Sequence, residues 1–231
     1  MVGGARGLKA FRALSTSVGS KFLVALTGLS LVGFLILHLA GNLLILIGPE
    51  KFNNYSHALI SNPLVIPAEL GLVGLLLVHV FKAVQHVVRG NTARPQSYTK
   101  QVWAGGTSRK SIGSATMLAS GLLLLAFLIT HLAKLKFGPY YPSTGIGAEA
   151  EVRDLYRLVA EVFQSPGLVV FYVISMIVIG LHLHHGISSA FQSLGLMTPG
   201  WTATILSAGL WLAIILSAGY ALIPVWVYFA L

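Results

Sequence analysis

Four histidines in this 231-residue sequence lie in four different long apolar segments, where an imidazole needs a partner. They are His38, His79, His131 and His182, one in each of four segments. Neutral imidazole is a common axial ligand of haem iron, and a pair from two facing helices leaves no open coordination site. Such a pair suits electron transfer rather than oxygen chemistry. For any single histidine, the alternative is a hydrogen bond to a neighbouring carbonyl.

The composition assigns the chain to the membrane proteins. Hydrophobic residues make up 55% of it, charged residues 9%, and the mean hydropathy is +0.81, which excludes a soluble domain. Long apolar runs without alternation also exclude a β-barrel. We predict an all-α fold, a single domain over 1–231 in which an antiparallel bundle of five transmembrane helices encloses two haems. The expected spans are 22–47, 68–88, 112–132, 167–190 and 201–231, with an interfacial helix over 149–163 on the outer side.

Charge placement predicts the orientation of these helices. With a cytoplasmic N-terminus, ten basic residues fall on the inner side and five on the outer side, as the positive-inside rule favours. All six acidic residues fall on the outer side. The formal charge of +9 therefore indicates topology, and nucleic-acid binding is not expected.

Two further features limit the chemistry. The sequence has no cysteine, which excludes a disulfide, a bound iron–sulfur cluster and a covalent c-type haem. The basic segment Met1–Ser20 shows no cleavage pattern, so we expect the first apolar helix to be retained.

Counting 1.5 Å per residue from the helix ends places the histidines at two depths. His38 and His131 are expected ~25 and ~30 Å above the inner surface, close to the outer face. His79 and His182 are expected ~16 and ~22 Å below the outer ends of their helices, in the inner half. The phrases Thr27-Gly28 and Ser120-Gly121 precede His38 and His131 by the same spacing, so helices one and three are expected to use their histidines alike.

The other four histidines have separate interpretations. His57 belongs to an outer, turn-rich loop and is either exposed or close to a quinone ring. His86 shares a helical stripe with His79 but lies near Arg89 at the inner surface, where a haem propionate or the interface is the expected contact. His184 and His185 end the fourth helix, and His185 is the main rival of His182 as a ligand.

Several phrases in order along the chain carry a family resemblance. They are His38-Leu-Ala-Gly-Asn42, Phe52-Asn-Asn-Tyr-Ser-His57, Val78-His79, Thr130-His131-Leu132 and His182-Leu-His-His-Gly186. Together they resemble the cytochrome b membrane-anchor subunit of succinate dehydrogenase and fumarate reductase, in the bacterial single-chain type with five helices and two haems. The resemblance covers nearly the whole chain, including the spacing of all four histidines.

The resemblance implies that His38 and His131 ligate a distal haem b and that His79 and His182 ligate a proximal one. It implies a subunit that is not catalytic on its own, partnered by a flavoprotein and an iron–sulfur subunit in the bacterial cytoplasmic membrane. Complexes of this kind can form higher oligomers. Electrons from succinate would pass to a membrane quinone, menaquinone rather than ubiquinone. Gly180 stands where some quinol-oxidising members carry a glutamate, so a transmembrane proton route is not expected.

Polar residues near the helix ends are candidates for two further contacts. Haem propionates, lipid phosphates or the soluble partner are expected to meet the set Lys21, His86, Arg89, Arg109, Lys110 and Ser114. A quinone needs an apolar cleft with a few donors. Its candidates are Asn42, His57 and Glu69 on the outer side, and Ser17, Arg109 and His86 on the inner side. The sequence does not choose between the two sides.

Two rival functions share some of these features. A dihaem cytochrome b that serves another quinone-linked dehydrogenase would have the same histidine layout. A haem-free transporter could use the histidines as a proton relay, but transporters usually have broken helices and intramembrane acids, which this sequence lacks.

Overall fold

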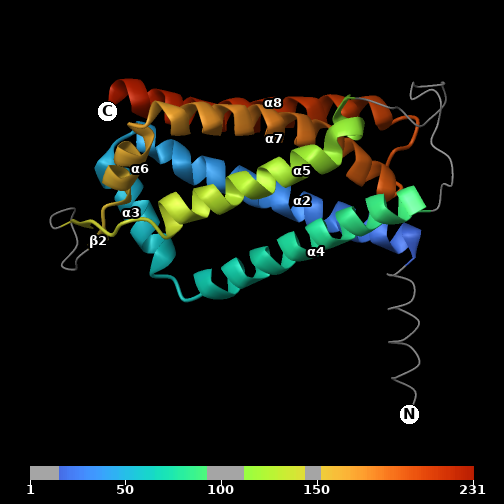
Figure 1. The fold of residues 1–231 in the computed structure, drawn as a ribbon, viewed down its shortest axis with the longest axis horizontal. Coiled ribbons are helices and arrows are strands. Elements are labelled where there is room, and N and C mark those ends of the chain that lie inside the picture. The colour runs from blue at the N-terminus through green and yellow to red at the C-terminus, as the bar shows by residue number, and fades with distance from the viewer. Residues whose placement is uncertain (1–15, 93–111, 144–151) are drawn as a thin grey trace, which may run out of the picture.

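The computed structural model describes residues 16–92, 112–143 and 152–231. Its five long helices are each long and apolar enough to cross a membrane, which confirms the predicted number for this part of the chain. They are α2 (Ser17–Asn42), α4 (Val65–Thr92), α5 (Ile112–His131), α7 (Pro166–Ser193) and α8 (Thr202–Ala230) (Figure 1). The shorter elements are η1 (Leu43–Leu46), α3 (Pro49–Ile60), η2 (Leu132–Lys136), β1 (Pro142–Ser143), β2 (Val152–Arg153) and α6 (Leu155–Phe163).

The helix ends differ from the predicted ones because the prediction followed the apolar runs alone. Helix α2 begins before Lys21, since the Thr16 hydroxyl accepts the Gly19 N–H at 3.0 Å and caps its first turn. Helix α4 likewise continues through Arg89. A helix satisfies its own backbone, so it extends past the hydrocarbon boundary into polar residues.

The predicted interfacial helix over 149–163 begins too early. Helix α6 starts at Leu155, where Asp154 caps it by accepting the Arg157 N–H at 3.0 Å. The two residues before Asp154 are extended, and they pair as β2 with β1 in an antiparallel ladder. Residues 149–151 lie outside the described part.

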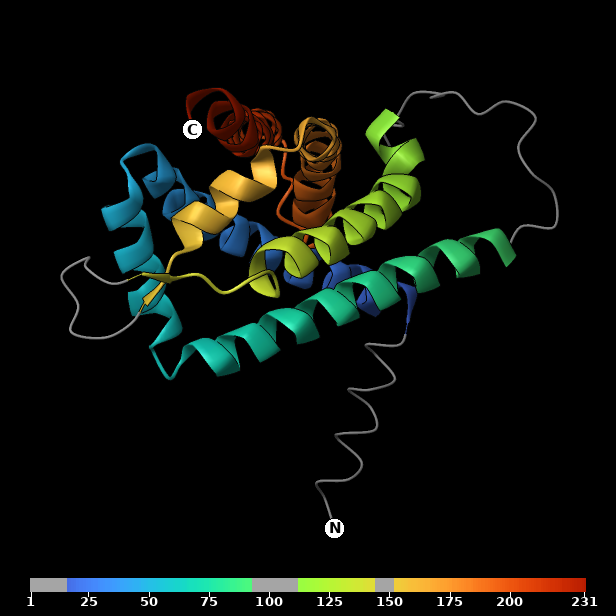
Figure 2. The ribbon, with the colours of Figure 1, turned by 60° about the vertical axis from the view of Figure 1, so that its left-hand side comes forward.

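Four of the long helices form a ring, and each of these four carries one candidate histidine. Helix α2 packs against α4 and α7, and α7 packs against α5. Helix α8 lies along α7, where the apolar core lies (Figures 1 and 2). Helices α4 and α5 touch much less, and none of the α4 side chains described by the structure is buried. The ring is therefore loosely closed between α4 and α5.

We call one end of the bundle the cap end because α3, α6 and the two short strands gather there (Figure 1). The fully buried Asn53 joins α3 to α6: its amide donates to Asp154 Oδ1 at 2.8 Å and accepts the Tyr156 N–H at 2.9 Å. The turn into α3 passes through Gly48, whose φ of 134° favours glycine. The loop predicted between the first two helices thus consists largely of a helix.

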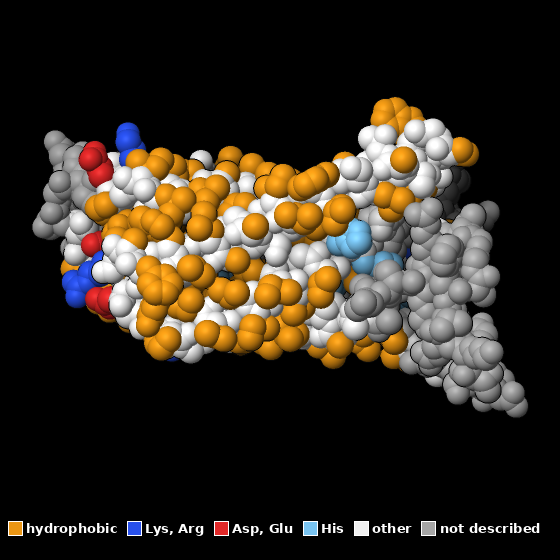
Figure 3. Space-filling model, turned by 90° about the horizontal axis from the view of Figure 1, so that it is seen from above, with side chains coloured by type: hydrophobic (Ala, Val, Ile, Leu, Met, Phe, Trp, Pro, Cys, Tyr) orange, Lys and Arg blue, Asp and Glu red, His pale blue; other side chains and the backbone are white. Residues whose placement is uncertain are grey.

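The opposite end, which we call the basic end, contains Lys21, Lys82 and Arg89 and no acidic residue among those the structure describes. Figure 3 shows an apolar band along the helices, with acidic and basic side chains at the cap end and histidines towards the other. Which end faces the cytoplasm stays a prediction from charge placement.

Candidate functional site

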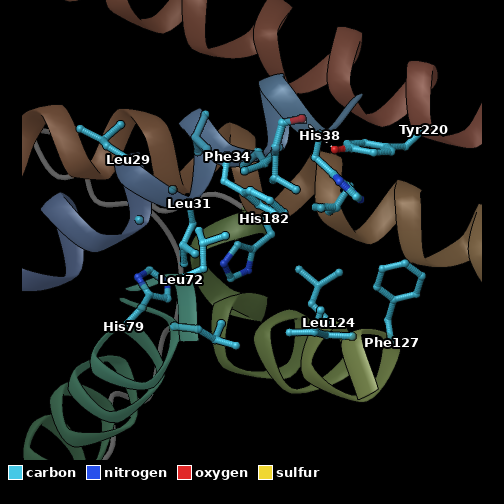
Figure 4. A pocket seen from close by; sticks show the side chains of 18 of the residues that line it. Leu29, Leu31, Phe34, His38, Leu72, His79, Leu124, Phe127, His182 and Tyr220 are labelled. Atoms are coloured by element: carbon cyan, nitrogen blue, oxygen red, sulfur yellow. Dashed lines mark hydrogen bonds between the residues drawn. The ribbon is translucent and has the colours of Figure 1, made fainter. Parts of the chain in front are cut away.

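All four candidate histidines line one open cavity of about 3440 Å³ inside the ring of α2, α4, α5 and α7. The rest of the lining is mainly apolar, with side chains such as Leu29, Leu72 and Leu124 (Figure 4). The structure therefore brings together the residues that the sequence singled out, although they are up to 144 positions apart.

His79 is held by a hydroxyl from the neighbouring helix. The Thr27 hydroxyl lies 2.7 Å from the Leu23 carbonyl, 3.2 Å from the Val24 carbonyl and 3.2 Å from His79 Nδ1. The single hydroxyl hydrogen goes to a backbone carbonyl, so we assign the proton between the hydroxyl and the ring to Nδ1, which donates to Thr27. The other ring nitrogen, Nε2, is then the neutral nitrogen that could bind a metal.

His182 has the same arrangement with a serine. The Ser120 hydroxyl donates to the Met117 carbonyl at 3.0 Å and lies 3.0 Å from His182 Nδ1. The His79 and His182 side chains both line the cavity, from α4 and α7 respectively (Figure 4). We call His79 and His182 the hydroxyl-held pair.

A glycine beside each of these hydroxyl residues leaves room for the imidazole. A Cβ at Gly28 would lie 3.1 Å from His79 Cε1, which is tighter than most real contacts. A Cβ at Gly121 would lie 3.6 Å from His182 Cε1, an ordinary contact. The phrases Thr27-Gly28 and Ser120-Gly121 thus serve histidines on other helices, and not the histidines that follow them in sequence.

His38 and His131 form the second pair, which we call the aromatic-lined pair. Their ring centroids lie 6.0 Å apart with the planes at 83°. Phe34 stacks on His38 at 5.1 Å, and Phe127 lies 5.7 Å from His131. The Tyr172 hydroxyl is 3.4 Å from His131 Nδ1, beyond the usual hydrogen-bond range.

The Tyr220 ring lies 6.1 Å from His38, but its hydroxyl donates to the Leu35 carbonyl at 2.7 Å. The Asn42 amide also donates to backbone, to the His38 carbonyl at 2.7 Å. Packing therefore positions the His38 imidazole.

The two pairs lie at two levels along the bundle. Thr27 precedes His38 by eleven residues on α2, and Ser120 precedes His131 by eleven on α5. At 1.5 Å per residue, both helices place the levels about 16 Å apart. Because both hydroxyl groups contact the hydroxyl-held pair, this spacing agrees with the two depths expected from sequence.

The spacing of the aromatic-lined pair fits two imidazole ligands of one metal ion. Metal–nitrogen bonds of about 2 Å on each side would leave the two ring centroids roughly 6 Å apart, close to the His38–His131 spacing. The cavity is larger than the ~300–1,000 Å³ of typical small-ligand pockets. Its apolar lining also suits a large planar ring.

The other predicted site residues are distributed over both ends. Asn42 and Glu69 line the cavity towards the cap end, and Glu69 pairs with Lys136; His57 lies on α3 and does not line the cavity. Lys21 and His86 line it towards the basic end. Ser17 and Arg89 line a smaller pocket there. Arg109, Lys110 and the side chain of Ser114 lie outside the described part.

His184 and His185 line the cavity as well, so position in the cavity does not distinguish His185 from His182 as the fourth ligand. His182, however, has the Ser120 contact from α5. Gly180 has a packing reason: a Cβ there would lie 2.9 Å from Ser217 Oγ, on α8. A glutamate at this position would require α7 and α8 to move apart.

Sequence reasoning missed Tyr172 and Tyr220, which flank the aromatic-lined pair. Neither stands at a fixed spacing from a histidine, and Tyr220 belongs to the one long helix that carries none. The hydroxyl residues were noticed by their spacing, but their partners were not.

No family model, curated protein or solved structure matches this chain.

Proposed function

We propose that this chain is the dihaem membrane-anchor subunit of a succinate:quinone oxidoreductase. The observation that carries the proposal is the meeting of four histidines, one from each of four helices, in one apolar cavity at two levels. Two such pairs would hold two b-type haems, each of which supplies a one-electron carrier when bound. The chain would have no substrate chemistry of its own.

The chain's own residues have three tasks in this proposal. His79 and His182 present Nε2 to the cavity because the Thr27 and Ser120 hydroxyl oxygens accept hydrogen bonds from their Nδ1–H groups. The mainly apolar lining lowers the local dielectric around the pairs, which strengthens each polar contact there. The basic end would face the flavoprotein and iron–sulfur subunits in the cytoplasm, as the positive-inside rule predicts.

A quinone, menaquinone in the proposal, would accept the electrons within the membrane. Asn42 and Glu69 at the cap end are better placed than His57, since only they line the cavity. Ser17 and His86 are the described candidates at the basic end.

A reduced-minus-oxidised spectrum with haem quantification on the purified chain tests the proposal. We expect two low-spin b-type haems per chain, and a haem-free chain would contradict the proposal. In intact membranes, succinate should reduce both haems, and a flavoprotein and an iron–sulfur protein should co-purify. Haem that is reducible only by another donor would favour a different quinone-linked dehydrogenase.

A further inference from the structure

A small pocket lies at the basic end, between the first turn of α2 and the last turns of α4. Its volume is about 300 Å³, and it is lined by Ser17, Ser20, His86, Arg89 and Gly90. None of these is a candidate axial ligand. The pocket therefore needs an explanation of its own.

Ser20 supplies the first observation that points to a ligand. Its side chain is 2% exposed, and its Oγ has no hydrogen-bond partner among the residues that the structure describes. Buried hydroxyl groups are almost always bonded, as Thr27 is on the same helix. A ligand oxygen in the pocket would provide the missing partner.

The groups around Ser20 favour a negative ligand. The Ser17 hydroxyl, the His86 imidazole and the Arg89 guanidinium line the same pocket, and the 26-residue helix α2 begins beside it, with the positive end of its dipole. No carboxylate competes, because the sequence has no acidic residue before Glu50 or between Leu70 and Ala148. An anion here meets donors and no like charge.

We propose that this pocket binds an anionic oxygen group, a phosphate or a carboxylate. Arginine binds both by paired, charge-assisted hydrogen bonds, and serine hydroxyls complete such sites. The phosphate of an anionic phospholipid is one source, since the pocket lies at the end of membrane-length helices.

The other source is the propionate of a haem held by the hydroxyl-held pair. His86 lines both the pocket and the main cavity, and it follows His79 by seven residues, about 10 Å along α4. Only this carboxylate source rests on the proposed function.

The lipid arm of the test titrates the full-length chain in detergent with phosphatidylglycerol and, separately, phosphatidylcholine, followed by native mass spectrometry. Ser20→Ala and Arg89→Gln are each expected to weaken phosphatidylglycerol binding about tenfold. The matched controls are Ser30→Ala on α2 and Lys82→Gln on α4, which do not line the pocket and should change it less than about twofold.

The haem arm measures the rate at which haem leaves the chain for excess apomyoglobin. If the carboxylate is the ligand, Ser20→Ala and Arg89→Gln speed the loss of one haem about tenfold, the controls do not, and lipid binding is unchanged. If the target and control variants behave alike in both arms, the pocket is not a site and the inference is overturned. A chain that never contains haem contradicts the proposed function alone, because the lipid arm still decides the inference.

Discussion

The two histidine pairs of this chain are positioned by different means. Each imidazole of the hydroxyl-held pair donates to a Ser or Thr hydroxyl that is itself anchored to backbone carbonyls of its helix. The aromatic-lined pair is surrounded by Phe34, Phe127 and two tyrosines, and the Tyr172 hydroxyl makes the one contact to a ring nitrogen found among the described residues, a long one. Hydrogen bonds thus determine which ring nitrogen is left without a proton in one pair, and packing orients the rings in the other.

This difference predicts different sensitivities. A directed hydrogen bond fixes the tautomer and raises ligand basicity, so its loss changes metal affinity and potential. Ring packing acts through shape, so its loss changes order and stability more than ligand chemistry. The variants below separate the two effects.

The largest effect is expected from removing ligands two at a time. His79→Ala with His182→Ala removes both ligands of one level, and one haem should remain. His38→Ala with His182→Ala removes one ligand from each level, and no bis-histidine haem should remain. Haem quantification and the low-spin spectrum measure the result. His57→Ala, off the cavity, is the control and should keep both haems.

The pairing is wrong if the two double variants retain the same amount of haem. His185→Ala tests the rival ligand in the same assay. Should it remove a haem while His182→Ala does not, the fourth ligand is His185 and the Ser120 contact has another role.

Next in size are substitutions at the glycines of the hydroxyl-held pair. Gly28→Leu would fill the space of the His79 imidazole, and one haem should be lost. Alanine should separate the two glycines: Gly28→Ala, at 3.1 Å, should weaken haem binding about tenfold, and Gly121→Ala, at 3.6 Å, should be tolerated. Gly33→Leu on the same helix is the control, since nothing lies within 4 Å of its Cβ.

The hydroxyl groups should give an intermediate effect. Thr27→Val keeps the shape of the side chain but removes the hydroxyl that contacts His79 Nδ1, which should weaken haem binding about 10- to 100-fold. Ser120→Ala should act alike on His182, and Thr27→Ser should restore the wild-type behaviour. Redox titration should show the potential of one haem rising by on the order of tens of mV.

Tyr172→Phe is the matched test in the aromatic-lined pair. Its 3.4 Å contact is long, so haem affinity should fall less than about threefold. Equal effects of Tyr172→Phe and Thr27→Val would remove the distinction between the two pairs.

Much of this arrangement can be predicted from the sequence. The thickness of a membrane fixes the length of each spanning helix, and a residue's position along the helix fixes its depth. Apolar length predicts the five helices, and residue counts along them predict two levels of histidines. The helix ends at Thr16 and Asp154 were not predicted, because capping by one side chain is independent of hydropathy.

The contacts between helices could not be predicted from the sequence. Thr27 and Ser120 each precede a histidine of their own helix by eleven residues, but they contact His79 and His182 on neighbouring helices. Side chains of adjacent helices meet when they lie at the same depth in the bundle. Tyr220 reaches His38 only because α8 lies close to α2. Neighbour relations of this kind depend on the packing of the ring, which no local pattern encodes.

The smallest effect is expected at the cap end, where Phe163 of α6 lies 4.9 Å from Tyr172, which flanks the aromatic-lined pair. The Tyr141 hydroxyl, which lies before α6 in the chain, and the Arg157 guanidinium of α6 donate to Glu161 at 2.5 and 2.8 Å and hold its pKa below the usual 4.5. A lowered pKa stabilises the fold above pH 4.5, and this contribution disappears as the pH falls through the folded-state value. Because the group is exposed, the change in thermal unfolding should be small.

Glu161→Gln should abolish this loss of stability at low pH, and Glu50→Gln on α3 should retain it. Thermal unfolding followed at the absorption of each haem from pH 6 downwards, with steps chosen around the usual Glu161 pKa of 4.5, measures both. The comparison predicts that the small wild-type loss is seen first at the haem of the aromatic-lined pair, because α6 contacts Tyr172 and has no contact with Thr27 or Ser120 among the interactions of the described residues. An equal response at both haems would mean that the cap end stabilises all four helices of the ring. The two pairs would then depend on the same packing at the cap end despite their different hydrogen bonds.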